Sequence, residues 1–468
     1  MKITLYRRFP AGVQRIVRRM YSFLPIEARM GKAYTSMKKF LRSAERWSED
    51  EIVHWQTGRL KEIISHAYNT TPGYNQLFRE ANVSPDTFQK LDDIRLFPFV
   101  SKELLRDNLK EFTSTAVPDW KRLYRTTGGS TGIPFGFYLQ QDDIEREMAF
   151  LNSAWERAGW KLGDVSAVFR GAFVGSPEHF WEYDPFLRDL RFSTYYLTEE
   201  TYPRYKKKIL SERPDHLQAY PSAATLLADL VLQNGDTGKI PFKLLLLGSE
   251  NLYDWQKEKI ISAFPSSKIF SWYGHAEQVL FAPMCEHSAS LHLDPFYGLP
   301  EVIDDHNNEI DEGESGELVG TSLWNKTTPL IRYRTMDVAR KGTLGCRQCG
   351  RNYRLLDKID GRLQELIVTK SGRYISMTAI NMHSDVFDNV KQFQFHQKEK
   401  GKVTFKIVKK AGYNEKNTEM INSELKKKLG NDVELELAFV GSIEKPQSGK
   451  FRFLIQEIPM KYGNHDRP

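Results

Sequence analysis

The sequence predicts an α/β protein: a large N-terminal domain of mostly parallel sheets and helices, followed by a small, mobile α+β C-terminal domain. Three observations predict this fold. From about residue 120, strand-sized apolar runs alternate with longer helix-like stretches. The 468 residues are 40% hydrophobic and 12% aromatic, so a large core can form. The character of the chain changes near Leu356–Lys358, beyond which short strand-like runs and one helix-like stretch follow.

The large domain divides into two expected parts. Residues 1–115 are expected to be helical, because apolar residues recur at helical spacing between prolines. Residues 116–357 are expected to form an α/β core. Buried strands are expected at Val165–Phe169, Leu244–Leu247 and Lys268–Trp272, and helices at Asp143–Ala158, Tyr202–Ser211, Ala223–Gln233 and Tyr253–Ala263.

The C-terminal part is expected to be a separate small domain. Residues 358–365 are expected to form a hinge, and residues 366–468 the domain itself. Strands are expected at Glu365–Thr369, Val403–Val408 and Val433–Val440, with a lysine-rich helix at Asn417–Leu429.

Charge and cysteine content favour a cytoplasmic protein. The net charge is only +7, and the three cysteines are too few for a disulfide scaffold. No apolar run approaches the ~20 residues that span a bilayer. Residues 1–50 carry 12 Lys/Arg against four Asp/Glu. This basic segment predicts either a helix packed on the body, which we favour, or peripheral contact with the inner membrane. No zinc-finger spacing or Arg/aromatic cluster indicates nucleic-acid binding.

A loop rich in glycine and hydroxyl residues is the most informative motif. Tyr124–Pro134 holds three glycines among four hydroxyl residues, so its backbone N–H groups and hydroxyls suit phosphate oxygens. It lacks the Gly-Lys-Ser/Thr of a Walker A loop. Taken alone, it could equally be a polar turn.

Further polar motifs follow predicted strands. Trp272–Glu277 and Gly248–Glu250 stand at the carboxyl ends of strands, where open α/β sheets bind ligands. Asp337 offers a carboxylate suited to sugar hydroxyls. Ser448–Lys450 supplies a lysine on a C-terminal loop. Each motif is weak alone, but their order along the chain is informative.

In that order the motifs resemble the adenylate-forming superfamily of acyl-CoA and aryl-CoA ligases. The likeness is greatest to phenylacetate–CoA ligase-like proteins, especially the CapK-like branch found with capsular polysaccharide genes. The resemblance covers about residues 60–455. It rests on Thr126–Pro134, Tyr220–Ser222, Gly248–Glu250, Tyr273–Glu277, Tyr333–Asp337, Gly361–Arg362 and Ser448–Lys450.

The resemblance implies a role for each motif in ATP-dependent formation of an acyl-adenylate. Phosphates would be held by Thr126, Thr127, Gly128, Gly129, Ser130, Thr131 and Gly132. The adenine would be framed by Gly248, Ser249, Glu250, Trp272, Tyr273 and Gly274, with His275 beside them. Glu277 would bind Mg²⁺, and Asp337 the ribose hydroxyls. Arg362 would support ribose or phosphate, and Lys450 would neutralise charge on the α-phosphate, which phosphoryl chemistry requires.

Three positions depart from the family pattern. Ile133 stands where many relatives have lysine, and Met336 where the usual residue is glycine. Gln364 and Glu365 occupy the place of the hinge aspartate, so the pivot is not fixed by the resemblance.

The cysteines form a second candidate site. Cys346 and Cys349 have the spacing of a metal-binding knuckle, and Cys285 with His292 completes a Cys₃His set for structural Zn²⁺. His287 is the alternative fourth ligand, disfavoured because a Cys-x-His spacing is tight. The other interpretation is three unrelated buried thiols.

Two functions therefore remain open. The first is an AMP-forming carboxylate ligase that transfers an acyl group to CoA or to an amine, with CoA favoured, in surface polysaccharide biosynthesis. The second is a catalytically degenerate nucleotide-binding protein at the membrane surface. Candidate acid-pocket residues are Phe169, Arg170, Phe173, Tyr220 and Ser222. The carboxylic acid and the oligomeric state cannot be read from the sequence.

Overall fold

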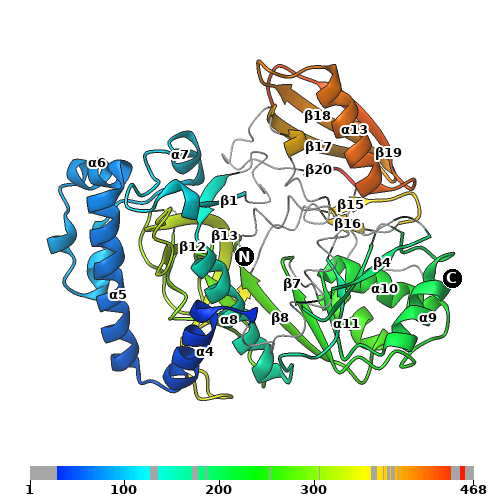
Figure 1. The fold of residues 1–468 in the computed structure, drawn as a ribbon, viewed down its shortest axis with the longest axis horizontal. Helices are drawn as coiled ribbons and strands as arrows, with labels where there is room; N and C mark the ends of the chain where they lie inside the picture. The colour runs from blue at the N-terminus through cyan, green and yellow to red at the C-terminus, as the bar shows by residue number, and fades with distance from the viewer. Residues whose placement is uncertain are drawn as a thin grey trace. The chain divides into compact units, whose positions relative to one another are not determined.

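The computed structural model confirms the predicted α/β class, since helices alternate with strands of a parallel-containing sheet (Figure 1). The residues it describes are 20, 29–126, 135–170, 176, 178–184, 187–194, 196–250, 252, 254–304, 306–359, 366–372, 374–376, 380, 385–387, 389–443 and 454–458. None of the helices in these segments is long and apolar enough to cross a membrane. Nearly all of the basic segment before residue 29 lies outside them, so both interpretations of it stay predictions.

The chain forms two compact units that are interleaved in sequence. The first comprises residues 1–43, 144–247 and 258–270, and its strands are ordered β4-β5-β3-β6-β7. β3, β5, β6 and β7 run parallel, and β4 pairs antiparallel with β5 at the edge. Every residue of β3, β6 and β7 is buried, as in sheets covered on both faces. The strand bounds are β3 (Ser166–Phe169), β4 (Trp181–Asp184), β5 (Asp189–Phe192), β6 (His216–Ala219) and β7 (Leu244–Gly248).

Among the described residues, the helices that lie wholly or almost wholly in this unit are α4 (Lys32–Ala44), α8 (Gln141–Ala158), α9 (Tyr202–Glu212) and α10 (Pro221–Gln233). The divisions between the units fall inside helix α11 (Asp254–Ala263) and inside strand β8 (Lys268–Gly274).

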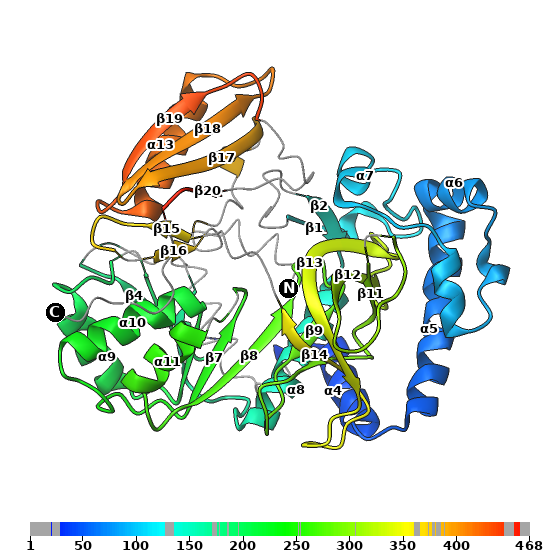
Figure 2. The same cartoon turned by 180° about the vertical axis from the view of Figure 1, so that it is seen from behind.

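The second unit comprises residues 44–143, 248–257 and 271–468. Its largest sheet has the order β10-β14-β13-β12-β11, and every pair in it is antiparallel. Figure 2 shows β13 as a long, curved strand, and its pairing with β12 and β14 is interrupted by bulges. The bounds of its strands are β10 (Leu291–Leu293), β11 (Gly298–Ile303), β12 (Ser315–Ser322), β13 (Tyr333–Leu344) and β14 (Arg354–Ile359). Strand β9 (Phe281–Pro283) is not part of this sheet and pairs antiparallel with β8.

Helices precede this sheet in the sequence, and their ends follow local rules. Ser48 and Glu51 form a reciprocal capping box at the start of α5, and Pro72 occupies the first turn of α6. The Tyr74 hydroxyl of α6 donates to the Pro329 carbonyl at 3.0 Å, which fixes the helix beside the start of β13. The elements are α5 (Glu49–Thr70), α6 (Pro72–Glu80), α7 (Lys102–Asp107), and the 3₁₀ helices η1 (Pro85–Thr87), η2 (Leu91–Leu96) and η3 (Asp119–Lys121).

The C-terminal part has its own four-stranded sheet of order β19-β18-β17-β20, with α13 covering one face (Figures 1 and 2). Phe395 of β17 pairs with Phe405 of β18, and both point into a core with Ile421 and Leu425 of α13. The bounds are β15 (Leu366–Val368), β16 (Tyr374–Ser376), η4 (Asp385–Phe387), β17 (Val390–Glu399), β18 (Lys402–Lys409), α13 (Glu415–Leu429), β19 (Glu434–Phe439) and β20 (Leu454–Gln456).

A buried glutamine joins the β15–β16 hairpin to this sheet. Gln397 is fully buried; its amide oxygen accepts from the Val368 N–H at 2.7 Å, and its NH₂ donates to the Val368 carbonyl at 2.7 Å. The side chain therefore satisfies both backbone groups of one residue, as a neighbouring strand would. The Gln456 amide adds a 2.8 Å hydrogen bond to the Gln397 oxygen.

Candidate functional site

The glycine-rich motif connects two antiparallel strands. β1 (Leu123–Thr126) and β2 (Gly136–Leu139) pair from Leu123 with Leu139 to Thr126 with Gly136. A Cβ atom at position 136 would lie 2.1 Å from the Tyr124 hydroxyl, so any larger residue would require the exposed Tyr124 side chain to move. Thr126 is thus placed at the end of a hairpin, while residues 127–134 lie outside the described residues.

A tryptophan lies directly over the end of β7. A Cβ atom on Gly248 would lie 2.4 Å from Cε2 of the Trp272 indole, so the ring occupies the space that any side chain would need. Ser249 follows with φ +68°, a left-handed conformation that turns the chain sharply. The predicted adenine-framing residues Gly248, Ser249 and Trp272 are therefore gathered in one place.

Tyr273, His275 and Asp337 are joined by hydrogen bonds. The Tyr273 hydroxyl donates to Asp337 Oδ2 at 2.8 Å and lies 2.5 Å from His275 Nε2. His275 Nε2 lies 3.2 Å from the same carboxylate oxygen. The side chains of His275 and Asp337 are only 10% and 16% exposed, so the carboxylate is held in a largely enclosed place.

Glu277 lies buried nearby in sequence, with 7% of its surface exposed. The hydroxyl of Tyr333, at the start of β13, donates to Glu277 Oε1 at 3.1 Å. No basic side chain in the described segments forms an ion pair with this carboxylate. A buried carboxylate usually requires a cation, so Glu277 has the chemistry of a metal ligand.

Several predicted residues are not placed by the structure. Arg362, Lys450 and the hinge positions Gln364 and Glu365 lie outside the described residues, as do loop residues 127–132. Their roles stay predictions. Of the candidate acid-pocket residues, Phe169 is buried in β3, and the Arg170 guanidinium lies 5.6 Å from the Tyr220 ring centroid. Phe173 and the side chain of Ser222 lie outside the described part.

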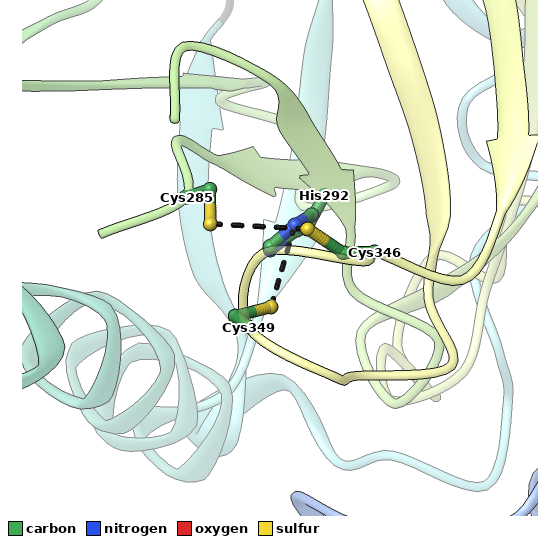
Figure 3. A group of neighbouring side chains, drawn as sticks. All are labelled: Cys285, His292, Cys346 and Cys349. Carbon is green, nitrogen blue, oxygen red and sulfur yellow. Dashed lines mark hydrogen bonds between the residues drawn. The ribbon is translucent and has the colours of Figure 1, made fainter. Parts of the chain in front are cut away.

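All three cysteines of the chain and His292 form one buried cluster (Figure 3). Cys285 Sγ lies 3.9 Å from Cys346 Sγ, and Cys349 Sγ lies 3.8 Å from His292 Nε2. All four ligand atoms lie within 4.8 Å of one another. Zn–S bonds of ~2.3 Å in a tetrahedron separate ligand atoms by ~3.8 Å, so the cluster fits a zinc ion. The imidazole of His287 is 59% exposed and is not part of this cluster.

Two tight turns bring these ligands together. The Cys285 N–H donates to the Ser290 carbonyl at 2.8 Å, which closes the turn leading to His292 on β10. The Gly350 N–H donates to the Cys346 carbonyl at 2.7 Å, and Gly350 has φ +72°. Burial raises the pKa of the Cys349 thiol to about 11. A bound metal ion would replace that proton, since cysteine ligates as the thiolate.

Sequence analysis missed the arginine that supports this cluster. Arg351 is 2% exposed and donates to Glu286 Oε2 at 2.8 Å and to Glu45 Oε1 at 2.9 Å. Burial lowers the pKa of Arg351, but the hydrogen bonds and charges of Glu286 and Glu45 outweigh it and hold that pKa above its ordinary value. Glu286 and Arg351 adjoin metal-ligating positions in sequence, which was an available signal. Glu45, about 300 positions away, gave none.

Comparisons with known proteins agree with this geometry. A family model described as the CapK C-terminal domain matches residues 367–457. Phenylacetate-coenzyme A ligase of Escherichia coli (strain K12) is 29% identical over 341 residues, covering 70% of this chain and 74% of that protein. Protein CapK of Staphylococcus aureus is 23% identical over 467 residues, covering 97% and 99% respectively.

A solved structure shares the fold. The crystal structure of 2-hydroxyisobutyryl-CoA ligase in complex with 2-HIB-AMP and CoA, in the thioesterification state, has a TM-score of 0.60 and 19% identity, covering 88% of this chain and 91% of that one. Fold and relatives together define the class: the chain is an adenylate-forming, acyl-CoA ligase-like enzyme. Within that class it is similar to the phenylacetate–CoA ligases over most of its length and to the CapK C-terminal domain over residues 367–457, which confirms the resemblance drawn from the motifs.

Proposed function

We propose that the chain is an ATP-dependent, AMP-forming carboxylate ligase that makes an acyl-adenylate and transfers the acyl group to the thiol of CoA or to an amine. One observation carries the proposal: Trp272, the hydrogen-bonded Asp337 and the buried Glu277 stand at the positions that the resemblance assigns to adenine, ribose and Mg²⁺. The relation to phenylacetate-coenzyme A ligases supports CoA as the acceptor.

In the first half-reaction, a carboxylate oxygen of the acid attacks the α-phosphorus of ATP, and pyrophosphate leaves with the electron pair of the broken P–O bond. Asp337 holds the ribose and the Trp272 region holds the adenine, so the α-phosphate is fixed relative to the acid. Glu277 would hold Mg²⁺, which when bound neutralises phosphate charge. Lys450 is assigned to neutralise charge at the α-phosphate.

In the second half-reaction, the thiol or amine attacks the acyl carbon, loses its proton, and displaces AMP by breaking the acyl C–O bond. Lys450 and the incoming nucleophile need access to the same reacting group. Residues 366–468 are therefore proposed to turn about residues 358–365 between the two steps.

Zinc is proposed to have a structural role in the Cys₃His cluster. All four residues are buried, and four protein ligands fill a tetrahedral site and leave no position for substrate. Because the site needs reduced thiols, we place the protein in the cytoplasm. A role in surface polysaccharide biosynthesis is the proposed context, since the CapK relative matches 97% of the chain.

Pyrophosphate release over a panel of carboxylic acids, in the presence of ATP and Mg²⁺, tests the proposal. We expect release that depends on one class of acid, followed by AMP release when CoA or an amine is added. Separate incubations with CoA and with amino sugars or amino acids identify the acceptor. ATP binding without pyrophosphate release, for every acid, would instead support the degenerate nucleotide-binding protein.

A further inference from the structure

Three polar atoms at the proposed ribose site form a closed triangle. They are the hydroxyl oxygen of Tyr273, Nε2 of His275 and Oδ2 of Asp337, separated by 2.5, 2.8 and 3.2 Å. The Tyr273 and His275 rings meet edge to face, with centroids 4.8 Å apart. Two of these contacts therefore converge on one oxygen of the Asp337 carboxylate, and the third joins their two partners.

The protons available to these atoms can be assigned. The tyrosine hydroxyl has one proton and directs it to Asp337, so the contact between Tyr273 and His275 needs a proton on Nε2 of the imidazole. The other nitrogen of His275, Nδ1, is buried with no hydrogen-bond partner among the described residues. A proton there would be a buried, unsatisfied donor, which is costly. The contacts place a proton on Nε2 of His275, which donates towards Tyr273 and Asp337.

The backbone holds Asp337 from the other side. The residue before it, Met336, has φ +64°, a left-handed conformation that is uncommon outside glycine, and its N–H donates to Glu317 Oε1 at 3.2 Å. The Asp337 N–H donates to the Thr335 hydroxyl at 3.2 Å. The carboxylate of Asp337 and its backbone are thus both held by hydrogen bonds before a nucleotide binds.

We propose that His275 is a positioning residue for the ribose-binding carboxylate rather than part of the adenine frame. Its Nε2–H, together with the Tyr273 hydroxyl, orients Asp337 to accept the hydrogen bonds of the ribose hydroxyls. This inference rests on the proposed function. A carboxylate fixed in advance loses less conformational freedom on binding. It also rejects a sugar that lacks a hydroxyl, because the polar site is then left incompletely paired.

Calorimetric titration of the full-length protein with Mg·ATP and with Mg·2′-deoxy-ATP tests this role without knowledge of the acid substrate. We expect His275→Leu to weaken ATP binding about tenfold, which matches one hydrogen bond to a charged group. Binding of 2′-deoxy-ATP should change less. The dissociation constant for 2′-deoxy-ATP divided by that for ATP should therefore fall. His275→Gln, which keeps an N–H donor near the Nε2 position, should restore most of the ratio.

Controls separate the possible failures. His54→Leu changes an exposed histidine of α5 and should leave both dissociation constants unchanged. Tyr273→Phe removes the other donor and should lower the same ratio even if His275→Leu folds poorly. A His275→Leu protein that is folded and keeps the wild-type ratio overturns the inference and leaves the proposed function standing. A wild-type protein that binds neither nucleotide overturns the proposed function, and the inference with it.

Discussion

Replacing Gly248 with alanine tests how the end of β7 shapes the candidate nucleotide site. The added Cβ atom would lie 2.4 Å from Cε2 and 2.5 Å from Cζ2 of the Trp272 indole. Carbon atoms in ordinary contact are about 3.5–4.0 Å apart, so the ring must move by about 1 Å or more. We expect the substitution to destabilise the fold by about 1–3 kcal/mol, as overpacking usually does, and to weaken ATP binding.

Urea unfolding followed by tryptophan fluorescence measures the stability change, and calorimetric titration with Mg·ATP measures binding. Gly58→Ala is the matched control, because a Cβ atom there meets nothing within 4 Å and the residue is inside helix α5. Alanine is the better helix former, so Gly58→Ala should stabilise the fold by up to about 1 kcal/mol.

The steric explanation also predicts non-additivity. Trp272→Ala removes the ring that the new methyl group would strike, so the stability costs of Gly248→Ala and Trp272→Ala should not add in the double variant. Wild-type stability and wild-type ATP affinity in Gly248→Ala would refute the reasoning.

Four further predictions follow from the structure. Freshly purified, unchelated protein should contain about one zinc per chain, and Cys346→Ser should lower its melting temperature and zinc content together; metal analysis that finds no zinc would contradict this. Arg351→Met should destabilise the fold by about 3 kcal/mol in urea unfolding, because Glu286 and Glu45 lose their shared cation; wild-type stability would count against that role. Lys450→Ala should slow acid-dependent pyrophosphate release about 10²–10³-fold, and a near-normal rate would remove the residue from the mechanism. Burial raises the pKa of Asp189 to about 7, so the folded state keeps a proton that the unfolded state releases. The free energy of unfolding should therefore fall between pH 4 and pH 7, and Asp189→Asn should flatten that fall; an unchanged pH profile would show that this carboxyl is ionised throughout.

The local elements were largely predictable because their signals lie within a few residues. The four-leucine run became the core of β7, and the helix expected at Asp143–Ala158 is α8, which begins two residues earlier at Gln141. Strand β17 was missed, although Phe393 and Phe395 alternate with polar residues there. The polar residues between them are glutamine, lysine and histidine, which are not typical strand formers, so the alternation was not interpreted as an amphipathic strand.

Long-range pairing was much less predictable. The antiparallel sheet of residues 291–359 depends on partners such as Tyr333 and Gly320, whose register no local pattern reveals. The metal cluster is the instructive contrast. Its four residues come from two separate segments, 285–292 and 346–349, yet cysteine is rare enough here and metal chemistry specific enough to group them. Common residues such as Glu45 and Tyr333, which support Arg351 and Glu277, offered no comparable signal.

The Gln397 amide has a mechanical consequence. The Gln397 amide pairs with both backbone groups of Val368, so the β15–β16 hairpin is hydrogen-bonded to the sheet of β17. The hairpin cannot move relative to that sheet without breaking these buried hydrogen bonds. If the small domain rotates during the reaction, the β15–β16 hairpin would move with the sheet of β17 as one rigid body that begins at Leu366. Substituting Gln397 with leucine would remove the side-chain hydrogen bonds to Val368. The Gly401 N–H would still donate to the Val368 carbonyl at 2.9 Å, so the hairpin would be held more weakly but not released.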